Sequence, residues 1–387
     1  MTTGTPARDA APRRRPRDRK QQILAAARER FWSQGYHRVA MADLAASVDI
    51  GASALYRHFR GKQELLLAVL DDDLTHFERA AHAPGTDPVD GIARVGLERR
   101  GFGVIWEREA GHLPEPERRA IRHRLRALSE TLGAASPDRA AADIRTWAAL
   151  SVLDSPSHHR SSPDPERFRQ LITGSARACL AAPLPAPAAT GPAGRHDPPR
   201  LVPASRREAL LAAAVRLFAE RGYPSVGLID IGAATGIAGP SVYNHFPTKN
   251  DLLEAALRRG EERLWLGLHH VLARADDEAS ALRLLVEDYT AFASTDPQLV
   301  GILLSEIIHL PAERRTAFRT RQLDYVAEWV ALFRAARPGL EVSEARVLVH
   351  AALAVVNSLT RIRHLRSHPG IDAEIAALAH AVLRPDQ

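Results

Sequence analysis

Two short stretches of the chain carry side chains suited to reading DNA. Arg57 and Asn244 occupy equivalent positions in them. A guanidinium group suits guanine O6 and N7, and a side-chain amide suits adenine N6 and N7, although either can bond a phosphate instead. Small, aromatic and imidazole residues complete the candidate DNA-binding set: Ala52, Ser53, Ala54, Tyr56 and His58 in the first stretch, and Gly239, Pro240, Ser241, Tyr243 and His245 in the second. We expect both stretches to enter a major groove, with ordinary surface histidines as the alternative for His58 and His245.

Lys62 and Lys249 follow these stretches at identical spacing, each close to the start of a further predicted helix. A phosphate at a helix N-terminus gains free backbone N–H groups as well as the charge of a nearby ammonium. Both lysines are therefore predicted to contact the DNA backbone.

Two Glu-x-x-His pairs could in principle bind a metal or exchange a proton. Glu109 and His112, and likewise Glu306 and His309, lie one helical turn apart. A metal site needs at least a third ligand, and no His, Cys or acid stands at a suitable spacing nearby. Both pairs also precede Leu-Pro, which stops a helix. We favour a structural corner between helices, and predict no metal, no cofactor and no enzyme activity.

Both stretches belong to an internal repeat. Residues 35–66 align without a gap on residues 222–253, at a shift of 187. Further matches join Glu109–Pro114 to Glu306–Pro311 at a shift of 197, and residues 148–152 to residues 351–355 at a shift of 203. A repeat of this extent indicates two whole units joined end to end.

Apolar residues recur at helical spacing in each unit, and no stretch alternates with a period of two, so we predict an all-α fold. In the first copy we expect helices over Ile23–Gln34, Ala40–Ser47 and Ala52–His58, with Gly35 ending the first. In the second copy we expect the last of the three over Gly239–His245. A short turn between the second and third helices is typical of a helix-turn-helix.

Both copies resemble the DNA-binding domain of the TetR family of bacterial transcriptional regulators. The resemblance covers about 50 residues per copy and rests on the closing pattern Tyr-x-His-Phe, then x-x-Lys and Leu-Leu. It implies two tandem units, each with a helical regulatory and dimerisation domain behind its DNA-binding head. It also implies that the predicted helices Ala312–Ala335 and Ser343–Ser367 stand where the family has its dimerisation helices. Their apolar faces could be internal core or a partner surface, and the equivalent helices of the first half could pair with them.

The growing shift between repeats places the missing residues of the first unit where the family builds its ligand pocket. The second unit keeps more aromatic residues there, so we predict its ligand-binding residues as Trp265, Tyr289, Phe292 and Trp329. Aromatic rings with few charges nearby suit a small apolar or amphipathic effector. Aromatics at helical spacing are equally typical of a core, and this alternative stays open.

Charge and composition indicate the partners and the compartment to expect for this protein. The net charge is +6 and the sequence pI about 9.9, with seven basic residues among the first twenty. We expect this arm to contact phosphates, with a solvated tail as the alternative for its first dozen residues. A single cysteine, Cys179, fits a reducing compartment. An apolar leader and a membrane-length stretch are both lacking, so we expect a cytoplasmic protein that does not enter a membrane.

The predicted domains follow from these features: a disordered basic arm (1–16), the first DNA-binding domain (17–64), a shortened first regulatory domain (65–180), a Pro/Ala/Gly linker (181–204), the second DNA-binding domain (205–251) and a second ligand-binding and dimerisation domain (252–387).

The sequence therefore predicts a DNA-binding transcriptional regulator, most simply a ligand-released repressor. Its single chain would form an intramolecular pseudo-dimer on a pseudo-palindromic operator in double-stranded DNA. The alternative is a ligand-independent, architectural DNA-binding protein with degenerate pockets, and an enzyme comes third. The repressor or activator role, and further pairing of two chains, stay open.

Overall fold

A computed structural model describes residues 16–134, 139–185, 203–237, 239–366 and 368–384. Helices dominate these ranges, and no strand occurs within them, which confirms the all-α prediction. The predicted basic arm lies outside the described residues except at Pro16, which begins a helix. Most of the predicted linker lies outside them as well.

The first half of the chain runs through nine α-helices with short 3-10 turns between some of them. They are α1 (Pro16–Gln34), η1 (Tyr36–Arg38), α2 (Met41–Ser47), α3 (Ala52–His58), α4 (Lys62–Ala81), α5 (Pro88–Glu98), α6 (Phe102–Glu109), η2 (Ala110–His112), α7 (Glu115–Gly133), α8 (Arg139–Asp154), η3 (Ser155–His158) and α9 (Pro165–Ala181).

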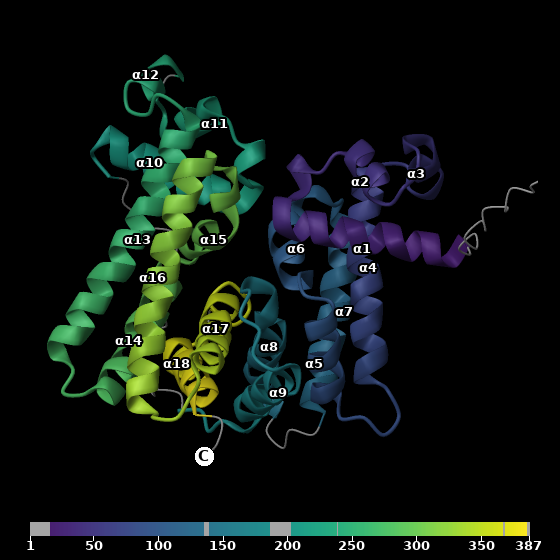
Figure 1. Cartoon of the computed structure of the whole chain (residues 1–387). Coiled ribbons are helices and arrows are strands. Elements are labelled where there is room, and N and C mark those ends of the chain that lie inside the picture. The colour runs from purple at the N-terminus through teal and green to yellow at the C-terminus, as the bar shows by residue number, and fades with distance from the viewer. Residues whose placement is uncertain (1–15, 135–138, 186–202, 238, 367, 385–387) are drawn as a thin grey trace, which may run out of the picture.

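The second half repeats this order of elements. It comprises α10 (Arg206–Arg221), η4 (Tyr223–Ser225), α11 (Leu228–Thr235), α12 (Gly239–Tyr243), α13 (Lys249–Arg274), α14 (Glu278–Thr295), α15 (Pro297–Ser305), η5 (Glu306–His309), α16 (Ala312–Ala336), α17 (Val342–Leu359) and α18 (Ile371–Leu383). In Figure 1 the two small heads, α1–α3 and α10–α12, stand apart at one end of the molecule.

The helices begin and end where local chemistry favours it. Asp87 and Asp164 each accept hydrogen bonds from backbone N–H groups of the first turn, and a proline follows each of them. Thr248 and Asp251 form a reciprocal capping box at the start of α13. Gly35 and Gly222 end α1 and α10 with positive φ angles of 82° and 76°, a conformation that glycine adopts without steric cost.

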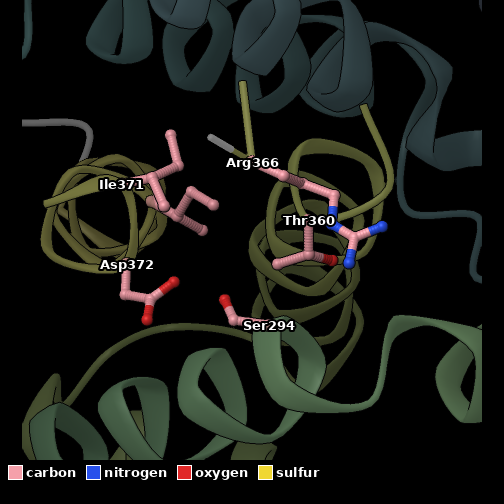
Figure 2. Close-up of a pocket in the computed structure, with 6 residues that line it drawn as sticks. Ser294, Thr360, Arg366, Ile371 and Asp372 are labelled. Atoms are coloured by element: carbon pink, nitrogen blue, oxygen red, sulfur yellow. The ribbon is translucent and has the colours of Figure 1, made fainter. Parts of the chain in front are cut away.

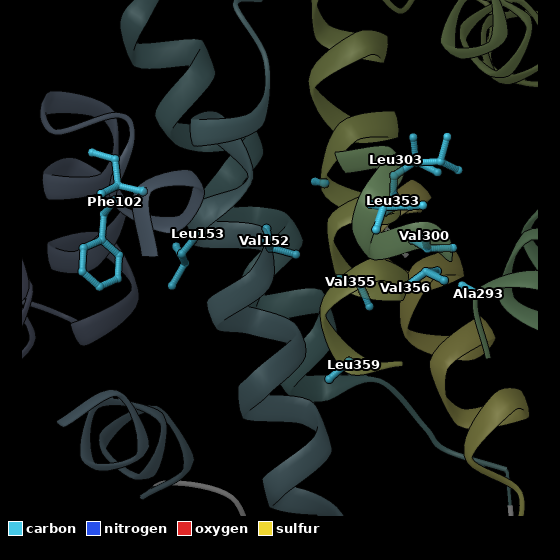
Figure 3. Packing of buried hydrophobic residues seen from close by; sticks show 14 of the residues in the cluster. Phe102, Val152, Leu153, Ala293, Val300, Leu303, Leu353, Val355, Val356 and Leu359 are labelled. Atoms are coloured by element: carbon cyan, nitrogen blue, oxygen red, sulfur yellow. The ribbon is translucent and has the colours of Figure 1, made fainter. Parts of the chain in front are cut away.

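The two halves pack on each other through their last two helices. Helices α8 and α9 contact α17 and α18, and together form the layer between the halves that we call the inter-half bundle (Figure 1). Figure 3 shows Val152 of α8 on the side toward α17, while Leu153 points back toward Phe102 of its own half. Val152, Leu153 and Leu359 are at most 2% exposed, so this bundle is part of the hydrophobic core.

The bundle decides between internal core and partner surface for the two expected dimerisation helices. Helix α16 packs on α14 and α17 of its own half as internal core, whereas α17, together with α18, contacts the other half. The predicted helix Ser343–Ser367 also ends earlier, at Leu359. Helix α17 is apolar and long enough to cross a membrane by composition alone, but 61% of it is buried. We therefore read it as the central core helix of the bundle.

Polar contacts connect the halves around this apolar bundle. Arg361 forms an ion pair with Glu107 at 2.6 Å, and Arg167 forms one with Glu344 at 2.7 Å. The imidazoles of His159 and His350 stack across the bundle with their centroids 4.6 Å apart.

Three helices of the first half are shorter than their counterparts, and one of them is α7, which has 19 residues where α16 has 25. Helix α4 has 20 residues where α13 has 26, and α5 has 11 where α14 has 18. These helices form the long side of each regulatory body, so the second half has the larger helical body, as the changing repeat shift predicts.

Candidate nucleic-acid interface

Each head contains a helix-turn-helix whose turn is closed in the same way. In the first head Ile50 N donates to Ala45 O at 3.1 Å, and in the second Ile237 N donates to Gly232 O at 2.9 Å. The turn needs one left-handed residue, which is Asp49 (φ 53°) in one head and Gly236 (φ 68°) in the other. Asp and Gly are among the few residues that adopt this conformation readily.

The third helix of the first head presents the predicted residues to solvent. Leu55 and Phe59 are buried, at 0% and 2% exposure, and anchor the helix to the head. Tyr56 is 52% exposed despite its large apolar ring. The remaining predicted residues of this face are exposed, apart from the partly covered Ala54: Ala52, Ser53, Arg57 and His58. Small and polar residues thus surround one exposed ring on a face free to enter a groove.

The second head differs at this face. Helix α12 ends at Tyr243, so Asn244 and His245 lie in the following turn and not in the predicted helix Gly239–His245. The carbonyl of His245 accepts a hydrogen bond from Arg207 at 2.7 Å. Tyr243 is 54% exposed and Asn244 is exposed, whereas His245 is partly covered. Pro240 is also exposed, and Ser241 is partly covered.

Lys62 and Lys249 each donate hydrogen bonds to backbone carbonyls of their own head. The Lys62 ammonium donates to Tyr36 O at 2.7 Å and Val39 O at 3.0 Å. Lys249 donates to the equivalent carbonyls of Tyr223 and Val226 at 2.7 and 2.8 Å. Each ammonium also lies over a tyrosine ring, 4.4 and 4.1 Å from its centroid. Two of the three N–H donors of each lysine thus fasten the turn after the first helix of the head, η1 or η4, to the start of the fourth helix, and the phosphate contact stays a prediction for the third donor.

A second repeated cation lies in each head, at a position that was not among the predicted site residues. The Lys20 ammonium lies 5.8 Å from the Phe59 ring centroid, and the Arg207 guanidinium lies 4.2 Å from that of Phe246. The shift of 187 relates both members of the two pairs, so the repeat itself contains the signal. These cations cover the base of each recognition helix and hold positive charge beside it.

The two Glu-x-x-His pairs lie where the regulatory bodies meet the heads. His112 stacks on Tyr36 with a centroid separation of 4.3 Å, and His309 stacks on Tyr223 at 5.1 Å. Glu306 accepts a hydrogen bond from the backbone N–H of Tyr223 at 3.3 Å and lies 3.4 Å from His309. Each pair therefore joins a body to its head, as expected for a structural corner.

Burial changes the pKa values of the histidines and of Glu306 at these corners. Burial, and then repulsion from His37, lowers the pKa of both His112 and His309 to about 4, so their imidazoles are neutral at pH 7. Burial likewise raises the pKa of the Glu306 carboxyl. In the part of the chain that the structure describes, no group of three or more His, Cys, Asp or Glu side chains is placed to hold a metal ion.

The structure brings the four predicted ligand-binding residues together. Trp329 is in edge contact with Tyr289 at 5.8 Å between centroids, and Phe292 lies 6.5 Å from Tyr289. Trp265 is partly buried and reaches the group through Tyr325 at 5.8 Å and the further contact of Tyr325 with Trp329 at 6.4 Å. The Tyr289 hydroxyl donates to Asn357 at 2.7 Å. We call this group the aromatic cluster.

Open space near the aromatic cluster is small. Figure 2 shows a narrow cavity between α14, the end of α17 and α18, which is lined in part by Ser294, Thr360 and Asp372. It is too narrow to admit a water molecule. The rings of the aromatic cluster themselves pack against one another, so a ligand there would need these helices to separate.

Comparison with known proteins agrees with the repeated head. The family described as "Bacterial regulatory proteins, tetR family" matches residues 23–69 and again residues 210–256. The domain described as "Tetracyclin repressor-like, C-terminal domain" matches residues 275–361.

Curated relatives are similar over part of their length. The "HTH-type transcriptional activator FasR" of Mycolicibacterium smegmatis is 35% identical over 99 residues, which are 26% of this chain and 45% of that protein. The "HTH-type transcriptional repressor KstR2" of Rhodococcus jostii is 30% identical over 131 residues, which are 34% of this chain and 64% of that protein. The chain thus spans about half to two thirds of the length of these two relatives.

Among solved structures, a TetR-family regulator from Bordetella parapertussis aligns with 46% of this chain and 92% of its own, with a TM-score of 0.42 and 19% identity. The regulator PfmR from Thermus thermophilus aligns with 46% of this chain and 96% of its own, with a TM-score of 0.40 and 22% identity. The two sequence matches to the DNA-binding domain decide the assignment. This chain belongs to the TetR family of bacterial regulatory proteins and carries the family's DNA-binding domain twice.

Proposed function

We propose that this protein is a cytoplasmic transcriptional repressor that occupies one operator as a single-chain pseudo-dimer. The observation that carries the proposal is the presence of two different heads on one chain whose halves share an inter-half bundle. A helix-turn-helix dimer binds two half-sites about one helical turn, roughly 34 Å, apart. One chain with two heads supplies both recognition helices without a second subunit.

Regulation would act through the separation of the heads. A ligand changes DNA affinity only if it binds one arrangement of the heads more tightly than another. The corners that contain His112 and His309 join each body to its head by stacking on Tyr36 and Tyr223. A shift of α6 or α15 would therefore carry the corresponding head with it.

The second half is the proposed sensor. Trp329 is 1% exposed, and its indole N–H interacts with the Tyr325 hydroxyl without forming a well-aligned hydrogen bond. An unmade buried hydrogen bond costs about 1 to 3 kcal/mol, and a ligand acceptor at this place would recover part of that cost. A small amphipathic molecule with one acceptor group and an apolar remainder fits the aromatic cluster.

The direction of control is also part of the proposal, because one relative is named an activator and the other a repressor. We favour repression because a rigid pair of heads on an operator blocks access to the DNA without any further partner. An architectural DNA-binding protein is the second candidate, favoured by the close packing of the aromatic cluster.

Stoichiometry tests the pseudo-dimer. Light scattering on the complex with a minimal operator, selected from random DNA, should give one chain per duplex. Tyr56→Ala and Tyr243→Ala should each weaken binding, because each removes an exposed ring from one head. Two chains per duplex, with one of these substitutions harmless, would show that each chain uses a single head.

A further inference from the structure

A pocket that the proposed function does not use lies between the first head and the second body. Its volume is about 320 Å³, and its lining comes from both halves: Ser33, Gln34, Arg38, Ile308, Arg315 and Arg319. We call it the junction pocket. Its size falls at the lower end of the range of small-ligand sites, about 300 to 1,000 Å³.

Charge distinguishes this pocket. Three of its six lining residues are arginines and none is acidic. Arg38 and Arg315 donate to the same carbonyl oxygen, that of Ile308, at 2.8 and 3.3 Å, which draws both guanidinium groups to one side of the pocket. Arg319 has no hydrogen bond or ion pair within the described residues.

The arginines repel one another. Partial burial, followed by repulsion from Arg315, Arg160, Arg108 and Arg38, lowers the pKa of the Arg319 guanidinium. Every charged group in that set is a cation. Arg38 and Arg319 are exposed, so solvent and salt screen part of this repulsion, and a bound counter-anion would relieve the rest.

In the first half, a carboxylate neutralises the two arginines at the corresponding positions. At the repeat shift of 197, Arg315 and Arg319 correspond to Arg118 and Arg122, and both of these form ion pairs with Glu115. The residue equivalent to Glu115 in the second half is Ala312. The second half has therefore kept the two arginines without the carboxylate that would neutralise them.

We propose that the junction pocket binds a small phosphate-bearing anion, which contacts the first head and the second body at once. Guanidinium groups bind phosphate oxygens through paired, charge-assisted hydrogen bonds, and three of them suit an anion of charge −2 or more. Arg38 stands at the end of η1 in the first head, whereas Arg315 and Arg319 belong to α16 of the second half. A bound anion would thus fix the distance between one head and the opposite body.

Inorganic pyrophosphate is the probe, titrated into the full chain by calorimetry without DNA or magnesium and at constant ionic strength. Arg319→Gln should weaken its binding about ten-fold, the effect of losing one hydrogen bond to a charged group. Arg79→Gln is the matched control, because Arg79 is an exposed arginine near the end of α4 and its loss changes the net charge equally.

A second variant tests the comparison between the halves without removing an arginine. Ala312→Glu restores the carboxylate that the first half uses, at an exposed position in the first turn of α16. It should weaken pyrophosphate binding by a similar factor while the fold is kept. Equal binding by the parent chain, Arg319→Gln and Ala312→Glu would overturn the proposal, as would no binding by the parent chain.

The same variants separate a small anion from DNA itself. If Arg319→Gln weakens operator binding while pyrophosphate binds to no variant, the arginines serve the DNA backbone and the proposal is wrong. Pyrophosphate binding that Arg319→Gln and Ala312→Glu both reduce supports the junction pocket whether or not the operator is affected. The pocket rests on the proposed function only for its effect on DNA affinity, so a failed DNA measurement does not count against the binding site.

Discussion

The two heads of this chain agree in their scaffold and differ where they would read DNA. Both close their turn with the same backbone hydrogen bond, and both fasten their helices with a lysine between two carbonyls. Arg57, however, lies within the seven-residue helix α3, whereas Asn244 lies beyond the five-residue helix α12. Positions that hold the head together have been kept, whereas four of the six candidate reading positions differ between the heads and only the tyrosine and the histidine are shared.

The two bodies differ in a related way. The first has shorter helices and neutralises the arginines of α7 with Glu115. The second has longer helices, the aromatic cluster and, on α16, arginines that face a pocket. We infer that sensing has been concentrated in the second half, while the first has become mainly a partner for the inter-half bundle.

The largest effect is expected in the second body. Trp329→Ala should lower the free energy of unfolding by about 3 to 5 kcal/mol, because it empties the centre of the aromatic cluster. Leu132→Ala, at the equivalent place in the first half, should fall toward the lower end of about 2 to 5 kcal/mol. Urea denaturation followed by circular dichroism gives both values. An equal or larger loss for Leu132→Ala would contradict the view that the aromatic cluster makes the larger contribution to the core.

Acid should weaken the inter-half bundle. Burial, followed by repulsion from His158 and Arg346, lowers the pKa of His350 to about 4. Burial, followed by repulsion from His350, Arg100, His158 and Arg346, lowers that of His159 well below its usual value. The unfolded chain therefore binds more protons between about pH 6.5 and pH 4, and stability falls across this window as the pH is lowered. The loss should be about 3 kcal/mol for His350, whose pKa lies at about 4 against the usual 6.5.

A ring substitution isolates this contribution. His350→Phe keeps a flat ring against His159 and removes one titrating group, so it should flatten the loss of stability between about pH 6.5 and pH 4. His123→Gln is the control, since His123 is exposed on α7. Denaturation midpoints measured across the pH range give the result. An unchanged acid profile for His350→Phe would show that the bundle does not respond to this histidine.

Alanine substitution on either reading face should change the base preference in one half-site only. Arg57→Ala and Asn244→Ala should each cost about 1 to 3 kcal/mol of operator affinity and relax the preference at one base pair, in different half-sites. A perfect palindrome of either half-site should bind more weakly than the natural operator, because one head then meets mismatched base pairs. Binding to a library of operator variants checks both. A uniform loss over all sequences would assign these two residues to phosphates.

The repeat explains how much of the fold and of the candidate site could be predicted. Gly35 and Gly222 end their helices as expected, and α3 has the predicted bounds, because these features depend on local sequence. The use of Lys62 depends on carbonyls of Tyr36 and Val39 that only the folded turn brings near. The partner of an apolar helix face is likewise decided by packing, so α18 could not be distinguished from α16 as a bundle helix.

The junction pocket escaped prediction for a related reason. Arg38 and Arg319 are 281 positions apart in the chain and belong to different halves, and no local pattern joins them. A comparison of Ala312 with Glu115 at the repeat shift could have indicated that one pair of arginines lacks its carboxylate. The sequence thus shows that the second half lacks this carboxylate, but it does not show that the arginines lie beside the first head.

The smallest expected effect is a difference in unfolding free energy between alanine substitutions at two equivalent glycines. Gly35 and Gly222 both have positive φ angles with extended ψ angles of 156° and 146°, so substitution by alanine should cost each head about 1 to 3 kcal/mol. A Cβ at Gly35 would also meet the Cδ1 atom of Ile308, from the other half, at 2.8 Å, whereas one at Gly222 meets only a proline atom at 3.8 Å.

Gly35→Ala should therefore cost about 0.5 to 1 kcal/mol more than Gly222→Ala, a modest overpacking penalty because the end of Ile308 can move. Adding Ile308→Ala should remove this excess in Gly35→Ala and leave the effect of Gly222→Ala unchanged, as a double-mutant cycle on unfolding free energies would measure. A persistent excess would assign it to the Glu109 carboxylate of the first body, which the added Cβ would approach to 3.3 Å. A vanishing excess would show that the first head rests on the second body, which is the contact that the junction pocket needs.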